Sequence, residues 1–210
     1  MQSLHVKVLL LPPLPTMRTS IITVCVVLAS FAQTQTIQFD AREATIATVH
    51  AALFTSQNSC RDVVSSFIAR IEAFNQDINA IITLNPDALD NADQLDISLA
   101  AGHATGSLFC VPILLKDNYD AAGLPTTAGS RALNASVPSE DSPAVTALRN
   151  AGAIILGKSN LHEFALEGLS VSSLGGQTTN PYDFSRTPGG SSGGTGAAIA
   201  ASFAVFGTGK

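Results

Sequence analysis

The chain has 210 residues, enough for one domain with a hydrophobic core. Hydrophobic residues make up 46% of it and charged residues only 13%, against roughly 25% charged in an average soluble domain. The net charge is −5, and the Lys and Arg residues are scattered singly along the chain. The sequence therefore lacks the basic stripe that binds a phosphate backbone, and we expect no nucleic-acid partner.

The N-terminal residues have the composition of a secretory signal. The apolar run Ile21–Ala32 follows Arg18 and precedes a polar stretch, and it is shorter than the roughly 20 apolar residues that cross a bilayer. Small residues end the run at the positions that a signal peptidase reads. We predict a signal peptide over residues 1–32, with Met17 as a possible true start. Cleavage would leave a secreted protein without a stable membrane anchor; a membrane anchor or a buried strand is the alternative interpretation.

Helices and a strand are predicted in the next part of the chain. Residues 44–57 carry apolar side chains near helical spacing, and Ser59 with Asp62 forms a capping-box pattern that begins a second helix. The apolar face expected for this second helix consists of Val63, Val64, Phe67, Ile71 and Phe74. The β-branched run Ile78–Leu84 predicts a strand, and a helix from about Asp87 to Ala101 follows it.

Two further apolar runs predict buried strands. Leu108–Leu115 is unbroken by polar residues, which is typical of a strand covered on both faces, and Ala153–Leu156 is a shorter run of the same kind. Between them, Ser142-Pro143 opens a helix that Gly152 ends. The inner stripe expected for this helix consists of Ala144, Val145, Ala147, Leu148 and Ala151. This alternation predicts an α/β fold with helices on both faces of a sheet.

A lysine directly follows the first of these buried strands. Desolvation lowers the pKa of a buried lysine and makes its amine a usable base near neutral pH. Lys116 is therefore a candidate catalytic base. The alternative is that its ammonium group reaches solvent and pairs with Asp117 or another carboxylate.

A glycine-rich segment, Thr187–Gly194, carries two adjacent serines, Ser191 and Ser192, between pairs of glycines. Glycine permits positive φ angles and close approach of backbones, so the segment fits a functional loop. A flexible Gly/Ser linker is the alternative.

Taken together, these segments resemble the amidase signature family, whose members hydrolyse carboxylic amides with a Ser–Ser–Lys triad. The resemblance runs from about Ala44 to Lys210. The motifs that carry it are Val111–Asn118, Gly123–Ser130, Ala151–Asn160, Glu163–Ala165, Asn180-Pro181 and Thr187–Gly194. The resemblance implies an amidase-signature-type mixed sheet, of which residues 33–210 would form the N-terminal part, a small-molecule amide substrate and no cofactor or metal.

The resemblance also implies roles for individual residues. Lys116 matches the catalytic lysine, held neutral to act as the base, and Ser191 matches the middle member of the triad. In the family this serine follows a cis peptide bond, here Gly190–Ser191, beside Gly189. Ser130 and Ser192 match positions that support the site or the substrate.

The nucleophilic serine of the family lies in an Asp-Thr-Gly-Gly-Ser type block. Counted from Ser191, its position falls a few residues beyond Lys210. The same block would supply the backbone N–H groups of the oxyanion hole, which is often the largest electrostatic contribution to such catalysis. We therefore expect the 210-residue chain to be catalytically incomplete, with a sheet edge that is prone to aggregation.

Two other interpretations remain open. Ala204–Lys210 approaches the phosphate-loop pattern of nucleotide-binding proteins, although the Ser or Thr required after the lysine would lie beyond the chain. Alternatively, the chain is a secreted remnant that binds without catalysing.

The remaining polar candidates are weaker. Cys60 and Cys110 would both stay after signal cleavage; an oxidising compartment permits a disulfide, but a small buried thiol is the simpler prediction for Cys110. Asn134 begins a glycosylation sequon in a polar loop. The histidines, which are His5, His50, His103 and His162, share no catalytic or metal-binding spacing, and structural roles are expected for them.

Overall fold

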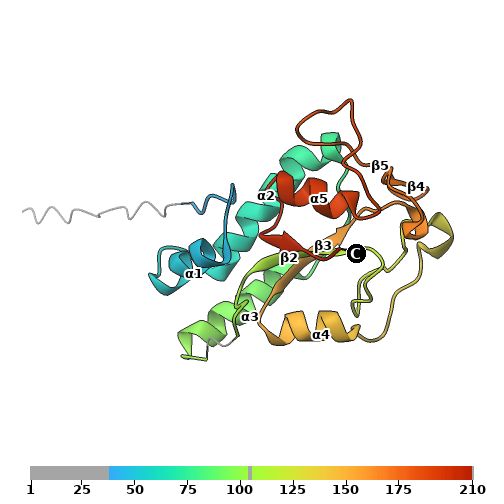
Figure 1. Ribbon diagram of the computed structural model, residues 1–210. Coiled ribbons are helices and arrows are strands. Elements are labelled where there is room, and N and C mark those ends of the chain that lie inside the picture. Colours follow the sequence, from blue (N-terminus) through green and yellow to red (C-terminus); the bar gives the residue numbers. More distant parts are fainter. Residues whose placement is uncertain (1–37, 104–105, 210) are drawn as a thin grey trace, which may run out of the picture. The chain divides into compact units, whose positions relative to one another are not determined.

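The computed structural model describes residues 38–103 and 106–209 (Figure 1). The predicted signal segment 1–32, which includes Met17 and His5, lies outside the described residues. Among the residues that are described, no helix is long and apolar enough to cross a membrane.

The first two helices follow the predicted pattern. Helix α1 spans Ile46–Phe54 and helix α2 spans Cys60–Ile78. Ser59 and Asp62 form the expected capping box, in which each side chain accepts a hydrogen bond from the backbone N–H of the other residue. The predicted face of α2 is buried except at one position. Phe74 is 46% exposed, and the Arg70 guanidinium lies over its ring at 5.0 Å from the centroid.

The predicted strand at 78–84 begins three residues later than expected. Ile78 is the last residue of α2, and Asn79 caps the helix in a left-handed conformation with φ 55°. Strand β1 spans Ile81–Leu84, and helix α3 spans Ala88–Ala100. The apolar run therefore contains both the end of a helix and a strand, and hydrophobicity alone does not show where one stops and the other begins.

The two central strands carry the core. Strand β2 spans Pro112–Lys116 and β3 spans Ile154–Ser159, and every residue of both is buried. Helix α4, Pro143–Asn150, connects them. The strand predicted at 108–115 begins four residues later than expected, because Leu108–Val111 forms a turn. In this turn the backbone N–H groups of Leu108 and Cys110 donate to the carbonyls of Ala151 and Gly152.

The predicted inner stripe of α4 was wrong at two positions. Val145 is fully buried and Leu148 is partly buried, but Ala144 and Ala147 are exposed. Gly152 follows the helix with φ +90°, a conformation that favours glycine and ends the element as predicted.

The strands form a mixed sheet in the order β1-β3-β2-β6. Strand β2 is parallel to both β3 and β6, and β1 is antiparallel to β3. The remaining elements are short: η1 (Arg131–Leu133), η2 (Glu163–Ala165), β4 (Val171–Ser172), β5 (Gly176–Gln177), α5 (Gly193–Ala200) and β6 (Phe206–Gly207). This mixed α/β architecture confirms the predicted fold class, and full burial of β2 and β3 requires cover on both of their faces.

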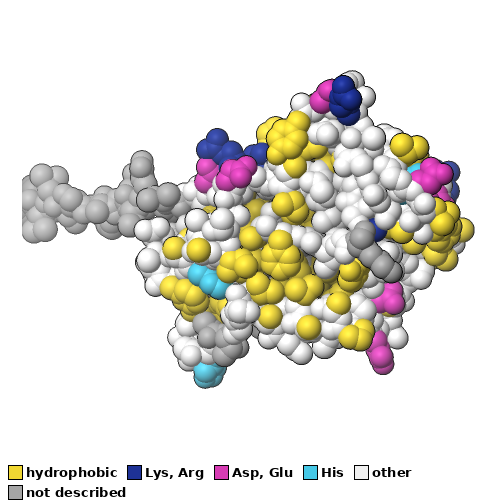
Figure 2. Space-filling model, in the orientation of Figure 1, with side chains coloured by type: hydrophobic (Ala, Val, Ile, Leu, Met, Phe, Trp, Pro, Cys, Tyr) yellow, Lys and Arg dark blue, Asp and Glu magenta, His cyan; other side chains and the backbone are white. Residues whose placement is uncertain are grey.

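Strand β6 lies at one edge of the sheet. Figure 2 shows hydrophobic side chains gathered on the face that carries β6 and β2 in this view. An exposed edge strand can pair with another chain, and the aggregation expected from the sequence stays a prediction.

A disulfide joins the start of α2 to the turn before β2. Cys60 and Cys110 are bonded, with their Cα atoms 5.8 Å apart, and both residues are fully buried. The expected free thiol at Cys110 was wrong. Cys110 adopts a left-handed conformation in its turn, with φ 58°, and the packing of α2 places Cys60 beside it. The bond closes a loop of sequence separation 50.

Backbone contact explains one glycine of α5, Gly194, and not another, Gly196. A Cβ at Gly194 would lie 2.0 Å from the carbonyl oxygen of Asn160, just after β3, whereas a Cβ at Gly196 would meet nothing within 4 Å. The start of α5 is therefore held against the end of β3 at a distance that only glycine allows.

We expect Cys60→Ala/Cys110→Ala to lower the free energy of unfolding by about 2–4 kcal/mol, because the bond restricts the unfolded chain. Urea unfolding followed by circular dichroism measures this loss. A reductant should lower the stability of the wild-type chain and leave the double variant unchanged. Equal stability of the two oxidised proteins would contradict the prediction.

Gly194→Ala and Gly196→Ala form a matched pair within one helix. We expect Gly194→Ala to destabilise the fold by about 1–3 kcal/mol, as overpacking does. Gly196→Ala should be neutral or stabilise the fold by about 0.5–1 kcal/mol, since alanine favours the helix. Thermal unfolding distinguishes the two, and similar melting temperatures would show that the contact with Asn160 does not constrain α5.

Candidate functional site

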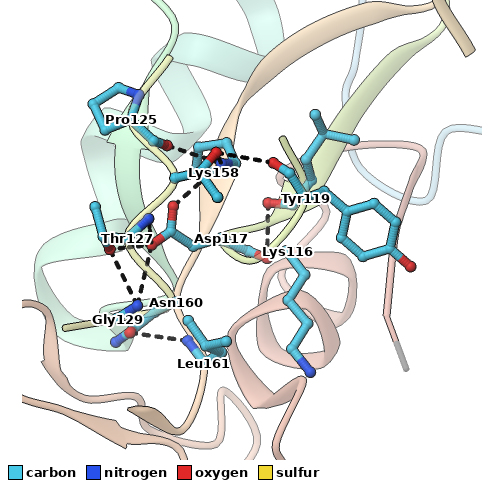
Figure 3. A network of polar contacts seen from close by, with 12 residues as sticks. Lys116, Asp117, Tyr119, Pro125, Thr127, Gly129, Lys158, Asn160 and Leu161 are labelled. Carbon is cyan, nitrogen blue, oxygen red and sulfur yellow. Dashed lines mark hydrogen bonds and ion pairs between the residues drawn. The ribbon is translucent and has the colours of Figure 1, made fainter. Parts of the chain in front are cut away.

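Polar residues gather where β2 and β3 end. Lys116 and Asp117 end or follow β2, and Lys158, Ser159 and Asn160 end or follow β3. All five are fully buried. Because the two strands are parallel, their carboxyl ends lie at the same edge of the sheet, where open α/β sheets place their ligands. This edge is the candidate site (Figure 3).

Lys116 points toward the glycine-rich loop. Its Nζ donates a hydrogen bond of 2.7 Å to Ser191 Oγ. Its backbone N–H donates to Thr208 Oγ1 at 2.8 Å, which fixes the end of β2 beside the segment that follows β6. The alternative in which the ammonium group reaches solvent was wrong, because Lys116 is fully buried.

The loop that carries Ser191 is fixed and does not behave as a linker. The Gly190–Ser191 peptide bond is cis, as the family resemblance implies, and Gly189 has φ +83°. Ser170 Oγ donates to the Gly189 carbonyl at 2.5 Å. The backbone N–H of His162 donates to the Ser191 carbonyl at 3.0 Å. The Ser191 hydroxyl is thus presented to Lys116 by hydrogen bonds on both sides of the cis bond.

The other predicted site residues differ in their burial and in their partners. Ser192 is partly buried at the N-cap of α5, directly after Ser191. Ser130 is buried and bonds to Glu163: hydrogen bonds from Ser173 and Ser130 hold the pKa of Glu163 below its ordinary value. Asn134 is exposed at the end of η1.

Sequence reasoning missed a second buried lysine. Lys158 Nζ lies 3.3 Å from Asp117 Oδ1, and both side chains are fully buried. It also donates to the Pro125 carbonyl at 2.8 Å and to Thr126 Oγ1 at 3.0 Å. Desolvation lowers the pKa of Lys158, and the Asp117 carboxylate opposes this shift. The signal that identified Lys116, a lysine at the end of a buried strand, applies equally to Lys158.

His50 and His162 have structural contacts. His50 Nε2 lies 3.1 Å from the Phe109 carbonyl oxygen. His162 Nδ1 accepts a hydrogen bond of 3.5 Å from the backbone N–H of Val171. His103 is exposed. Within residues 38–103 and 106–209, no group of three His, Cys, Asp or Glu side chains is placed to hold a metal ion.

The segment considered for phosphate binding is described up to Gly209. Phe206–Gly207 pairs with β2 as strand β6, and Thr208 accepts from Lys116 through Oγ1 and from Thr195 through its carbonyl. These groups are used inside the fold, and the described geometry gives the nucleotide-binding interpretation no support.

Comparisons with known proteins identify the family of this chain. Residues 62–210 match the family model described as Amidase. A glutamyl-tRNA(Gln) amidotransferase subunit from Heliobacterium modesticaldum is 41% identical over 163 residues, covering 77% of this chain and 34% of that protein. The corresponding protein from Picosynechococcus sp. is 42% identical over 167 residues, covering 79% of this chain and 34% of that protein.

Solved structures give the same result. The native peptide amidase from Stenotrophomonas maltophilia superposes with a TM-score of 0.74 at 39% identity, covering 78% of this chain and 35% of that one. An amidase family protein from Bacillus anthracis superposes with a TM-score of 0.75 at 28% identity, covering 80% and 35%. The chain thus spans about a third of the length of these relatives. From the matched residues and the superposed fold together, the chain belongs to the amidase signature family.

Proposed function

We propose that Lys116 and Ser191 are two members of a Ser–cis-Ser–Lys triad that hydrolyses carboxylic amides in the complete protein. The observation that carries this proposal is the 2.7 Å hydrogen bond from the buried Lys116 Nζ to Ser191 Oγ. A buried amine in contact with a hydroxyl can move a proton without a histidine. The glycine loop supports the proposal, because hydrogen bonds to the Gly189 and Ser191 carbonyls hold the loop where Ser191 meets Lys116.

In the proposed reaction, neutral Lys116 takes the proton of Ser191 while Ser191 takes the proton of the nucleophilic serine. That serine attacks the amide carbonyl, the C–N bond breaks, and the relayed proton passes to the leaving amine. Water then attacks the acyl-serine and releases the acid, so that an amide and water yield an acid and an amine. Splitting one difficult step into two easier ones is the general advantage of covalent catalysis.

The nucleophile is proposed to lie beyond Lys210, in sequence that also supplies the oxyanion hole. The relatives' names include peptide amidase and glutamyl-tRNA(Gln) amidotransferase. For this chain we propose a small-molecule amide substrate and no nucleic-acid partner, because its basic residues form no stripe.

We further propose that the protein is secreted after cleavage at Ala32 and glycosylated at Asn134. The Cys60–Cys110 disulfide supports an oxidising compartment. The sequon supports it too, since Asn134 is exposed at the end of a short helix.

The triad is tested by sequencing the transcript past the codon for Lys210 and assaying the extended protein on small amides. We expect an in-frame Gly-Gly-Ser type block and measurable hydrolysis. Lys116→Ala and Ser191→Ala should each lower kcat by about 10²–10⁴-fold, the usual contribution of proton transfer. Thr146→Ala, on the exposed surface of α4, is the matched control and should leave kcat unchanged. A stop codon directly after Lys210 would instead favour the non-catalytic remnant.

Secretion is tested by expressing the chain in a eukaryotic secretory host. We expect the medium to contain a protein that begins after Ala32 and loses mass on treatment with an N-glycosidase. Asn134→Gln should abolish this loss of mass without affecting export. Retention inside the cell with an intact N-terminus would refute the proposed localisation.

A further inference from the structure

Lys158 and Asp117 form a buried charged pair that the proposed reaction does not use directly. In the register of β2 with β3, Lys116 lies opposite Ser159, and Lys158 lies opposite Leu115. Successive side chains of a strand point to opposite faces. Lys158 therefore extends to the face of the sheet opposite Lys116, and Figure 3 shows the two side chains leaving the strand ends in different directions.

The carboxylate of Asp117 gathers the loop that follows it. It accepts hydrogen bonds of 3.2 Å from the backbone N–H groups of Thr127 and Gly129, and another from the Thr127 hydroxyl. Lys158 holds the start of the same loop through the Pro125 carbonyl and Thr126 Oγ1. Since Asp117 directly follows Lys116, these contacts also fix the end of the strand that carries Lys116.

The same loop is linked to Ser191 by backbone hydrogen bonds. The carbonyl of Ala128 accepts from Phe164 N–H at 2.9 Å, and the carbonyl of Gly129 accepts from Leu174 N–H at 3.0 Å. Two residues before Phe164, the backbone N–H of His162 donates to the Ser191 carbonyl. Hydrogen bonds and short stretches of chain thus run from Asp117 to both partners of the Lys116–Ser191 contact.

We propose that the Lys158–Asp117 ion pair positions Lys116 against Ser191. Lys158 extends to the face of the sheet opposite Lys116, and the proposed action of the pair runs through the strand end and the loop, so Lys158 and Asp117 are positioning residues. Lys158 neutralises a carboxylate that would otherwise be buried without a counter-ion, and the carboxylate holds the loop that supports the serine. The inference rests on the proposed function for its role in catalysis, but the contact that it explains is measured independently of activity.

The test uses the 210-residue chain labelled with isotopes at lysine. The labelled residues are then Lys7, Lys116, Lys158 and Lys210. The nuclear Overhauser cross-peak between Lys116 Hε and Ser191 Hβ reports the contact. We expect this cross-peak to be lost in Lys158→Met and weakened in Thr127→Val, which removes only the hydroxyl donor to Asp117.

Two controls separate positioning from general loosening. Thr127→Ser keeps the donor and should retain the cross-peak. Asp141→Asn removes another carboxylate that pairs with a cation, Arg149, and accepts a backbone N–H, and it should also retain the cross-peak.

An unchanged cross-peak in folded Thr127→Val and Lys158→Met overturns the proposal, as does an equal loss in Asp141→Asn. If Lys158→Met does not fold, comparing Thr127→Val with Thr127→Ser decides the question. The two proposals fail separately. An extended protein that hydrolyses no amide refutes the proposed function and leaves this result standing, whereas an insensitive cross-peak in an active enzyme refutes only the positioning role.

Discussion

Two lysines are fully buried at the carboxyl ends of neighbouring parallel strands. Removing a charge from water costs several kcal/mol unless partners replace the lost hydration. Lys158 finds a carboxylate, a carbonyl and a hydroxyl, and Lys116 finds the hydroxyl of Ser191. The loops at the strand ends supply these partners. Both amines are therefore buried with polar groups in place of water.

The glycines around Ser191 serve close packing more than flexibility. A Cβ at Gly193 would lie 1.9 Å from Ser170 Oγ, and one at Gly194 would lie 2.0 Å from the Asn160 carbonyl oxygen. The first turn of α5 therefore rests directly on the chain after β3 and on the segment that holds Gly189. A linker of the same composition would have no such contacts. Gly193 and Gly194 thus allow close contacts that a Cβ would block.

The chain belongs to the amidase signature family and spans about a third of the length of its relatives. The family accounts for the order of the motifs. The structure adds the pairing of Lys158 with Asp117 and a disulfide between Cys60 and Cys110. The disulfide holds Cys110, just before β2, and the ion pair holds Asp117, just after it. The strand that bears the proposed base is therefore held at both ends.

Local patterns in the sequence determined most of the elements. The capping box at Ser59, the apolar runs of β2 and β3 and the terminating glycine after α4 each depend on neighbours a few residues apart. The buried strand singled out Lys116, and the resemblance to the family assigned it and Ser191, 75 residues away, to one triad. Tertiary structure alone decided that Asp117 pairs with Lys158, that Cys110 is bonded, and that Phe74, Ala144 and Ala147 are exposed. These outcomes depend on strand order, register and helix packing, which join distant parts of the chain and leave no periodic signal within a single segment.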